Sequence, residues 1–196
     1  MSKLIYLIRH GVAQHNDNFL KYGKQTFYDP KFKDTHLTSI GELQSKRLNS
    51  EWTNIDDVEL VLISPLYRTL QTANNIFMNK DIQMLSLEDL REYPMGKHTC
   101  NMRSDRKILK NDFPNINFNL LVSDSDILWD PNTEESITSL EYRIEKIKEF
   151  IKNRPEKKIC IISHTAFIEK MKDDKISLLE NNLSEIKYCY PYTMNL

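Results

Sequence analysis

Four short apolar runs are the feature that most constrains how this chain can fold. They are Lys3–Ile8 (KLIYLI), Glu59–Ile63 (ELVLI), Ile82–Leu87 and Lys158–Ser163 (KICIIS). Each is the length of a strand and mainly apolar rather than alternating with polar residues, which is typical of strands buried on both faces of a parallel sheet. The runs therefore predict a mostly parallel sheet covered by helices.

The segments between these runs carry the helices that would cover the sheet. Leu37–Trp52 has helical spacing with Thr38 as its expected N-cap, and the Ser-Pro pair at 64–65 indicates a second helix start. Apolar residues at three- and four-residue steps predict a helix over Ile137–Ile151, and AFIEKMK after the last run predicts a short one. Residues 184–190 could add an edge strand. We therefore predict an α/β fold, a three-layer αβα sandwich with a mostly parallel central sheet.

The composition is that of one globular domain and gives no sign of binding to nucleic acid or to a membrane. A chain of 196 residues, 40% hydrophobic, predicts a single domain over residues 1–196. Its formal net charge of −1 gives no overall field to attract nucleic acid or an anionic membrane. No apolar run has the length of a bilayer span and no signal-peptide region is recognised, so we expect a cytoplasmic protein. Asn111–Asp130 fits an insertion or lid, or equally a solvated loop.

Neither a metal site nor a nucleotide-binding loop is predicted. The histidines show no HxxxH spacing; they are His10, His15, His36, His98 and His164. The three cysteines have no CxxC spacing and are interpreted as reduced, mostly buried thiols. The patterns GxxxxGK[ST] and GxGxxG are both missing from the sequence. We expect no cofactor.

Charged and polar residues follow the predicted strands where a parallel sheet places its ligands. They are Arg9 and His10 after the first run, Ser64 and Arg68 after the second, Glu92 after the third and His164 after the fourth. Ligands of open α/β sheets bind beyond the carboxyl ends of the strands, so these side chains are expected to converge. Guanidinium groups suit phosphate oxygens, neutral imidazole is a nucleophile near pH 7, and a protonated carboxyl can protonate a leaving oxygen. Each residue alone has an ordinary structural explanation; the combination predicts phosphoryl transfer.

Three segments together resemble the histidine phosphatase superfamily, also called the phosphoglycerate-mutase-like family. They are Arg9-His10-Gly11 after an apolar strand, SPLYRTLQTA at 64–73 and ISHTAF at 162–167. HLTSIGELQ at 36–44 and ILWDP at 127–131 make the chain most similar to a plant and fungal branch of mutase-like phosphatases. The resemblance runs from Lys3 to about Ile168.

The resemblance implies a role for each matching residue. His10 would be the nucleophile, Glu92 the proton donor and His164 a second histidine that holds the transferring phosphoryl group. Arg9 and Arg68 would bind the phosphate, with help from Asn16 unless that residue is a simple helix cap. The family also places a backbone carbonyl beside the first histidine, which would hold its Nδ1 proton and leave Nε2 to attack phosphorus.

The sequence departs from the family pattern in the loop that selects the substrate. After Cys100 it reads NMRSDRK, which keeps Arg103 and Arg106 but not a continuous basic run. Together with Lys97 and Lys107, these arginines either bind a second anionic group of the substrate or form an exposed basic face.

The predicted function is metal-independent hydrolysis of a small phosphorylated substrate through a phosphohistidine intermediate. Phosphoglycerate mutase activity is one alternative, although dedicated mutases carry longer insertions over the site. A non-catalytic phosphate-binding protein is the other alternative, and it would be expected to lose a catalytic residue. The oligomeric state and the substrate are not predicted.

Overall fold

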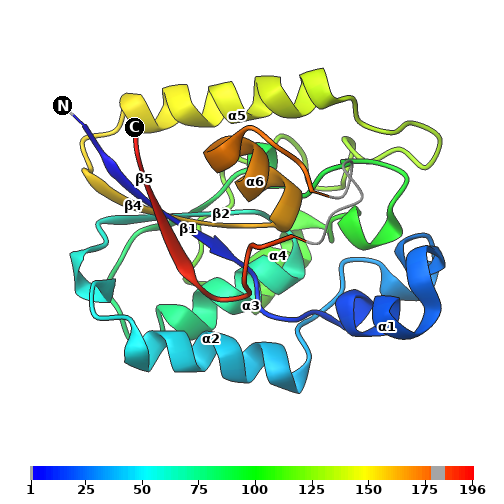
Figure 1. Cartoon of the computed structure of the whole chain (residues 1–196), viewed down its shortest axis with the longest axis horizontal. Coiled ribbons are helices and arrows are strands. Elements are labelled where there is room, and N and C mark those ends of the chain that lie inside the picture. Colours follow the sequence, from blue (N-terminus) through cyan, green and yellow to red (C-terminus); the bar gives the residue numbers. More distant parts are fainter. Residues whose placement is uncertain (1, 178–183) are drawn as a thin grey trace.

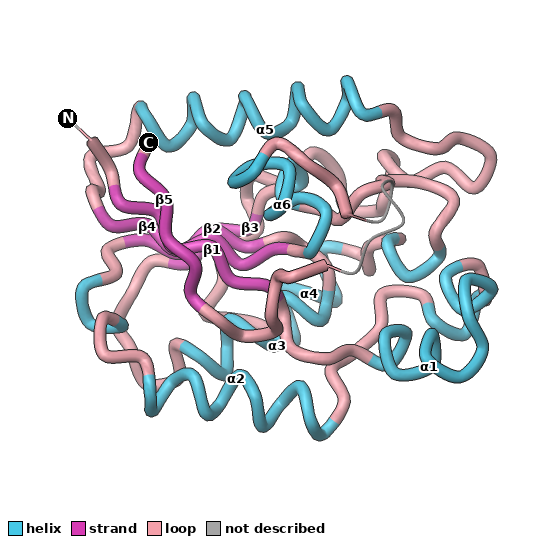
Figure 2. The backbone as a smooth tube through the Cα atoms, viewed as in Figure 1, coloured by secondary structure: helices cyan, strands magenta, loops and turns pink. Residues whose placement is uncertain are grey.

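A five-stranded sheet forms the centre of the computed structural model, which describes residues 2–177 and 184–196. Its strands are β1 (Leu4–Arg9), β2 (Leu60–Ile63), β3 (Met84–Ser86), β4 (Lys158–Ser163) and β5 (Pro191–Asn195). The strand order is β3-β2-β4-β1-β5, in which β5 runs antiparallel to β1 and the other neighbours are parallel (Figure 1, Figure 2). The predicted mostly parallel sheet is therefore confirmed.

The register of the central strands brings their carboxyl ends level with one another. In the β1–β4 pair, Leu4 lies opposite Lys158 and Arg9 opposite Ser163. The ladder continues past the strands, because the His10 amide donates to Ser163 O (3.1 Å) and the Ser64 amide donates to Ile162 O (3.1 Å). Three chain segments thus leave the sheet side by side at one edge, as parallel pairing requires.

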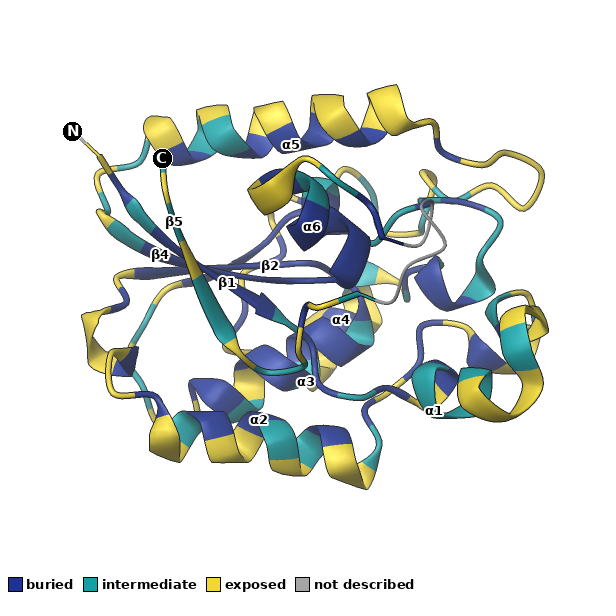
Figure 3. Cartoon of the chain, in the orientation of Figure 1, coloured by how far each residue is buried: buried dark blue, intermediate teal, exposed yellow. Residues whose placement is uncertain are grey.

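Helices cover both faces of the sheet and complete the three layers. One face is covered by α2 (Ser39–Glu51), α3 (Tyr67–Ile76) and α4 (Arg106–Asp112), and the other by α5 (Ile137–Lys152) and α6 (Thr165–Asp173). In β1, Tyr6 and Ile8 face the first layer whereas Ile5 and Leu7 face the second, as alternation along a strand dictates. The helices turn buried faces inward and exposed faces to solvent (Figure 3).

A smaller helical region lies beyond the carboxyl end of β1. There α1 (Gln14–Tyr22) is followed by short 3₁₀ turns, and it stands apart from the two helical layers (Figure 1). The 3₁₀ turns of the chain are η1 (Gly23–Phe27), η2 (Pro30–Phe32), η3 (Ile55–Asp57), η4 (Glu88–Leu90) and η5 (Thr99–Asn101). Within residues 2–177 and 184–196, no helix is both long and apolar enough to cross a membrane.

Several predicted elements are confirmed and two are displaced. Thr38 is the N-cap of α2, its Oγ1 accepting from the Gly41 amide (3.2 Å), and the predicted helix over Ile137–Ile151 is α5. The Ser-Pro pair at 64–65 does not start a helix, because α3 begins at Tyr67. The edge strand is β5 rather than residues 184–190.

The segment Asn111–Asp130 is not a purely solvated loop. Phe113, Ile116, Phe118 and Leu121 are buried in the layer that contains α2, α3 and α4. The Asn117 amide also donates to Met84 O (2.9 Å), which ties the segment to the edge strand β3. Burying these apolar side chains makes the segment part of the core.

Candidate active site

Three side chains from the carboxyl ends of the central strands form a buried cluster. His10 follows β1, Arg68 lies in the first turn of α3 after β2, and His164 is the N-cap of α6 after β4. Their exposed fractions are 2%, 1% and 0%. The predicted convergence of these residues is therefore present in the structure, and we call them the phosphate-site cluster together with Arg9 and Glu92.

His10 is held in one orientation by its own loop. Its Nδ1 lies 2.7 Å from Gly11 O, and since a carbonyl oxygen can only accept, Nδ1 carries the proton and donates. The lone pair therefore resides on Nε2, to which Arg68 Nε donates (3.3 Å). The contact that the resemblance implied is present, and it leaves Nε2 as the unprotonated nitrogen of a neutral ring.

Two glycines allow the loop at His10 to lie against α2. A Cβ on Gly11 would come within 2.5 Å of Gly41 O, and one on Gly41 would come within 2.2 Å of Val12 O. Real side chains do not tolerate such approaches. The Gly11 amide in turn donates to Thr72 Oγ1 (3.1 Å) of α3, which fixes the backbone that carries the Nδ1 acceptor.

Arg68 is fixed by the loop that contains η5. Its Nη1 donates to Cys100 O (2.8 Å) and its Nη2 donates to Asn101 Oδ1 (2.9 Å), while Nε faces His10. Asn101 is itself held, because its Nδ2 donates to Pro94 O (2.9 Å). The guanidinium is thus oriented by polar groups, and no carboxylate of the described residues forms an ion pair with it.

His164 has one engaged and one unengaged ring nitrogen. Its Nε2 lies 2.7 Å from Ser64 Oγ, whereas its buried Nδ1 has no hydrogen-bond partner among residues 2–177 and 184–196. The His10 and His164 rings meet edge to face with centroids 5.1 Å apart. Ser64 therefore orients the second histidine instead of capping a helix, and Nδ1 remains available for a ligand.

Arg9 and Glu92 complete the cluster from the neighbouring loops. The Nε of Arg9 is buried and has no hydrogen-bond partner within the described part of the chain. Glu92, in the loop after η4, accepts from the Tyr93 amide (2.9 Å), and both Arg9 and Arg68 lie close enough to influence its titration. A partly buried carboxyl thus faces two arginines.

Burial decides how the titratable groups of the cluster ionise. It lowers the pKa of His10 well below its ordinary value, and Arg68 and Arg9 lower it further. The pKa of His164 is lowered in the same way by burial and by Arg68. Burial raises the pKa of Glu92, although the Tyr93 amide and Arg68 oppose the rise. The cluster therefore combines neutral imidazoles with a carboxyl that keeps its proton to higher pH.

Asn16 was predicted to be either a phosphate ligand or a helix cap, and its side chain makes a capping contact. Its Oδ1 accepts from the Ala13 amide (3.1 Å) at the start of α1, and its Nδ2 lies 3.1 Å from His15 Nε2. His15 is buried and its Nδ1 lies 2.6 Å from Thr35 Oγ1. The His15 ring stands 6.4 Å from that of His10, so Asn16 is connected to the cluster through His15.

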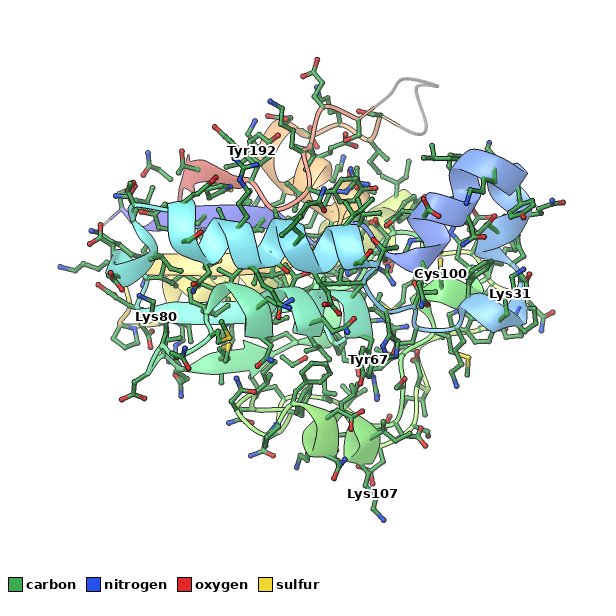
Figure 4. All side chains as sticks on the ribbon, turned by 90° about the horizontal axis from the view of Figure 1, so that it is seen from below. Lys31, Tyr67, Lys80, Cys100, Lys107 and Tyr192 are labelled. Carbon is green, nitrogen blue, oxygen red and sulfur yellow. The ribbon has the colours of Figure 1, made fainter. Side chains whose placement is uncertain are left out.

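Arg103 is buried and engaged by protein groups, which fits neither of its two predicted roles, a ligand for a second anionic group or part of an exposed basic face. Its side chain is fully buried, pairs with Glu88 (Nη2–Oε1, 3.0 Å) and donates to the carbonyl oxygens of residues 123–125. Arg106 is also directed elsewhere, since its Nε donates to Asp124 Oδ1 (2.6 Å). Lys107 extends into solvent from α4, away from the sheet (Figure 4). The two arginines hold a loop together and do not face the cluster.

Several residues that support the site were not identified from the sequence. Thr72, Asn101 and Gly41 act only through the backbone or side chain of a predicted residue. Thr72 lies within the motif SPLYRTLQTA, but nothing in the sequence indicates that its hydroxyl accepts from the Gly11 amide. No group of three or more potential metal-ligating side chains occurs in the part of the chain that the structure describes.

Comparisons with known proteins agree with the geometry. A family model described as histidine phosphatase superfamily (branch 1) matches residues 5–184. A phosphoglycerate mutase-like protein of Arabidopsis thaliana is 29% identical over 85% of this chain and 72% of its own length. A probable phosphatase of Schizosaccharomyces pombe is 27% identical over 95% of this chain and 84% of its own length.

Solved structures show the same fold at low sequence identity. The ecdysone phosphate phosphatase of Bombix mori, in complex with tungstate, superposes with a TM-score of 0.66 at 15% identity, covering 98% of this chain and 88% of its own. The alpha-ribazole phosphatase of Shigella flexneri gives a TM-score of 0.56 at 24% identity, covering 85% of this chain and 76% of its own.

Proposed function

Because the chain belongs to the histidine phosphatase superfamily, and so to a class of phosphatases and mutases, we propose that it hydrolyses phosphomonoesters through a phosphohistidine on His10. The observation that carries this proposal is the state of the His10 ring. Nδ1 is held by Gly11 O, and Nε2 keeps its lone pair beside Arg68. A fixed tautomer with an unprotonated Nε2 is what attack on phosphorus requires, once Arg68 Nε turns from Nε2 to a phosphate oxygen.

In the first step the phosphate group binds between the two arginines and His164. Arg9 Nε and His164 Nδ1 are buried donors without partners in the described chain, so a phosphate oxygen would satisfy both. For Nδ1 to donate, Nε2 of His164 must accept, and Ser64 Oγ–H donates to it. Binding the dianion also compensates the buried positive charge of Arg68.

Transfer and hydrolysis are two displacements at phosphorus. His10 Nε2 forms a bond to phosphorus as the bond to the ester oxygen breaks, and Glu92 gives its proton to the leaving alkoxide. Water then attacks the phosphohistidine, the P–N bond breaks, and the Glu92 carboxylate accepts a proton from that water. Glu92 is suited to both roles because burial raises its pKa. Two inversions give net retention at phosphorus.

The loop contacts favour a phosphatase over a mutase. A phosphoglycerate mutase must bind a substrate carboxylate beside the phosphate, and the predicted candidates for a second anion were Arg103, Arg106, Lys97 and Lys107. The two arginines are engaged with Glu88, Asp124 and nearby carbonyl oxygens. The mutase reading nevertheless has support in relatives named for mutases, one of them a probable phosphoglycerate mutase of Arthroderma benhamiae that is 28% identical.

Release of phosphate from p-nitrophenyl phosphate tests the proposal. We expect turnover by the wild-type protein and a loss of at least about 10³-fold in His10→Ala, because the nucleophile is removed. His36→Ala is the matched control, since His36 is exposed and stacks on Tyr67 (3.9 Å) outside the cluster. Equal rates for wild type and His10→Ala would contradict the assignment.

The same preparation separates the three functions considered. With 3-phosphoglycerate, a phosphatase releases inorganic phosphate, whereas a mutase produces 2-phosphoglycerate. A non-catalytic phosphate-binding protein would bind inorganic phosphate in calorimetry and hydrolyse neither substrate. Isomerisation faster than phosphate release would overturn the proposal in favour of the mutase.

A further inference from the structure

The C-terminal segment around Tyr188 encloses Arg9 from one side. The Cys189 amide donates to Arg9 O (2.9 Å), which places the two segments in a bridge beyond the end of β1. The Nη1 of Arg9 donates to Ile186 O (2.9 Å). The guanidinium carbon lies 3.6 Å from the centroid of the Tyr188 ring, which is face-on contact. Residues 184–190 thus supply both a hydrogen-bond acceptor and an aromatic face.

These contacts leave a defined part of the guanidinium unengaged. One face is covered by Tyr188, and Nη1 is bound to Ile186 O, whereas Nε is buried without a partner among the described residues. Arginine has a long side chain with many rotamers, so holding one of them reduces the entropy lost when an anion binds. The edge that contains Nε is therefore preset for a phosphate oxygen.

We propose that Tyr188 is a positioning residue that holds Arg9 in the orientation needed to bind the transferring phosphoryl group. The proposal rests on the proposed function, because it assigns Arg9 to the phosphate. The ring of Tyr188 also stands 6.1 Å from that of His10, so the same residue borders the nucleophile. Tyr188 acts through Arg9 and needs no contact with the substrate.

Core packing does not account for the position of Tyr188. Neither of the two buried apolar layers includes its ring, although its neighbours Cys189 and Tyr192 pack against those layers. The cation of Arg9 lies 3.6 Å from the centroid of the ring. A cation over an aromatic face is stabilised by the ring quadrupole, more strongly when water is excluded.

Two substitutions separate the aromatic face from the hydroxyl. Tyr188→Phe keeps the ring over Arg9, and Tyr188→Leu removes it while retaining apolar volume. The control is Tyr190→Leu, since Tyr190 is half exposed and meets Tyr192 edge to face (centroids 4.8 Å apart) rather than an arginine. For each protein we would measure the Kd of inorganic phosphate by calorimetry, kcat and KM for p-nitrophenyl phosphate, and Tm.

The expected pattern is a loss of phosphate affinity in one variant only. Tyr188→Leu should raise the Kd of phosphate and KM about tenfold, which matches a partly desolvated cation–π contact. Tyr188→Phe and Tyr190→Leu should stay within about twofold of wild type. Both leucine variants could lower Tm by removing a tyrosine from the packing. Only the loss of the ring over Arg9 should raise the Kd of phosphate, so a higher Kd in Tyr188→Leu alone indicates positioning rather than general stability.

Three results would overturn the proposal. They are an unchanged phosphate Kd in Tyr188→Leu, an equal loss in Tyr188→Phe, or an equal loss in Tyr190→Leu. The binding measurement does not depend on turnover. If wild type binds phosphate without hydrolysing the ester, and only Tyr188→Leu loses that binding, the proposed function fails and the positioning role stands.

Discussion

Two groups of buried or partly buried arginines behave differently in this molecule. In the first, Arg91 and Arg103 lie among Glu88 and Asp126, and we call these four residues the Glu88 cluster. Arg91 Nη2 lies 2.7 Å from Asp126 Oδ2, and Arg103 Nη2 lies 3.0 Å from Glu88 Oε1. The second group is Arg9 and Arg68 of the phosphate-site cluster, which form no ion pair within the described chain.

Between Arg68 and Arg103 the difference lies in charge compensation, because both side chains are equally buried. Arg68 and Arg103 each have 1% exposed surface. A buried Nε without a hydrogen-bond partner does not distinguish the two groups. Among the described residues it occurs in Arg91 and Arg103 as well as in Arg9. A buried charge without a counter-ion is costly unless a ligand supplies one. In the proposed function the uncompensated arginines bind the anion, whereas the compensated ones link parts of the structure to one another.

Replacing one arginine of each group by methionine is expected to give the largest differences in kcat and in the free energy of unfolding. Arg68→Met should lower kcat for p-nitrophenyl phosphate by about 10³-fold, the loss typical of a positive group on a phosphoryl transition state. Its free energy of unfolding should fall less than that of Arg103→Met, because no carboxylate loses a partner and only the neutral acceptors Cys100 O and Asn101 Oδ1 lose a donor. Steady-state kinetics and urea unfolding measure the two quantities.

Arg103→Met is the matched variant and should show the reverse pattern. It leaves Glu88 with a weaker contact, Arg91 Nη1 at 3.4 Å, so the free energy of unfolding should fall by about 3 kcal/mol. Turnover per folded molecule should stay near that of wild type. A tenfold or greater loss of kcat in folded Arg103→Met would show that the two groups are not functionally distinct.

Glu92→Gln is expected to have a smaller effect that depends on the leaving group. Glutamine cannot donate a proton, so hydrolysis of an alkyl phosphate should fall by about 10²-fold, whereas p-nitrophenyl phosphate, with its good leaving group, should be affected less. The ratio of the two rates in each protein is the measurement. Equal losses for both substrates would argue against Glu92 as the proton donor.

The pH dependence of alkyl phosphate hydrolysis tests the same carboxyl. The lowered pKa of His10 keeps the nucleophile neutral, so activity is lost only when acid protonates it well below pH 6.5. The raised pKa of Glu92 keeps the donor protonated above the usual carboxyl range, and activity falls as pH rises through that value. We expect the alkaline decline in wild type and its disappearance in Glu92→Gln.

The smallest expected effect comes from Ser64→Ala. The hydroxyl of Ser64 lies 2.7 Å from Nε2 of His164 and would donate to it when Nδ1 carries the proton, so its loss should lower kcat by about tenfold while His164 remains in place. Ser45→Ala is a control, since the Oγ of Ser45 bonds to Gly41 O (3.0 Å) inside α2. Comparable kcat losses in both variants would mean that the effect is not specific to the histidine.

Features that depend on neighbouring residues in the sequence were predicted better than contacts between residues far apart in the sequence. The apolar runs gave the strands, and Thr38 gave a helix start, because both signals come from neighbouring residues. His10, Arg68 and His164 were predictable because parallel strands bring their carboxyl ends together. The burial of Arg103 was not predicted because the sequence displays its charge but not its distant partners, Glu88 and the carbonyl oxygens of residues 123–125.

Tyr188 is a residue near the proposed site that the sequence did not point to. It contacts Arg9 across almost the whole chain, and the segment that carries it was expected to be a strand. No local periodicity connects a tyrosine near the C-terminus to an arginine after the first strand. Asn16 had two interpretations, and the structure shows the capping one, because its Oδ1 accepts from the Ala13 amide. Such contacts depend on tertiary structure alone.

Trapping the covalent intermediate tests the central claim most directly. The protein would be mixed with a phosphomonoester, quenched in alkali within a turnover and digested, and the phosphorylated peptide would be identified by mass spectrometry and ³¹P NMR. The account predicts a single phosphohistidine, on Nε2 of His10, that is missing in His10→Ala. Turnover without any labelled histidine, or a label on another residue, would contradict it.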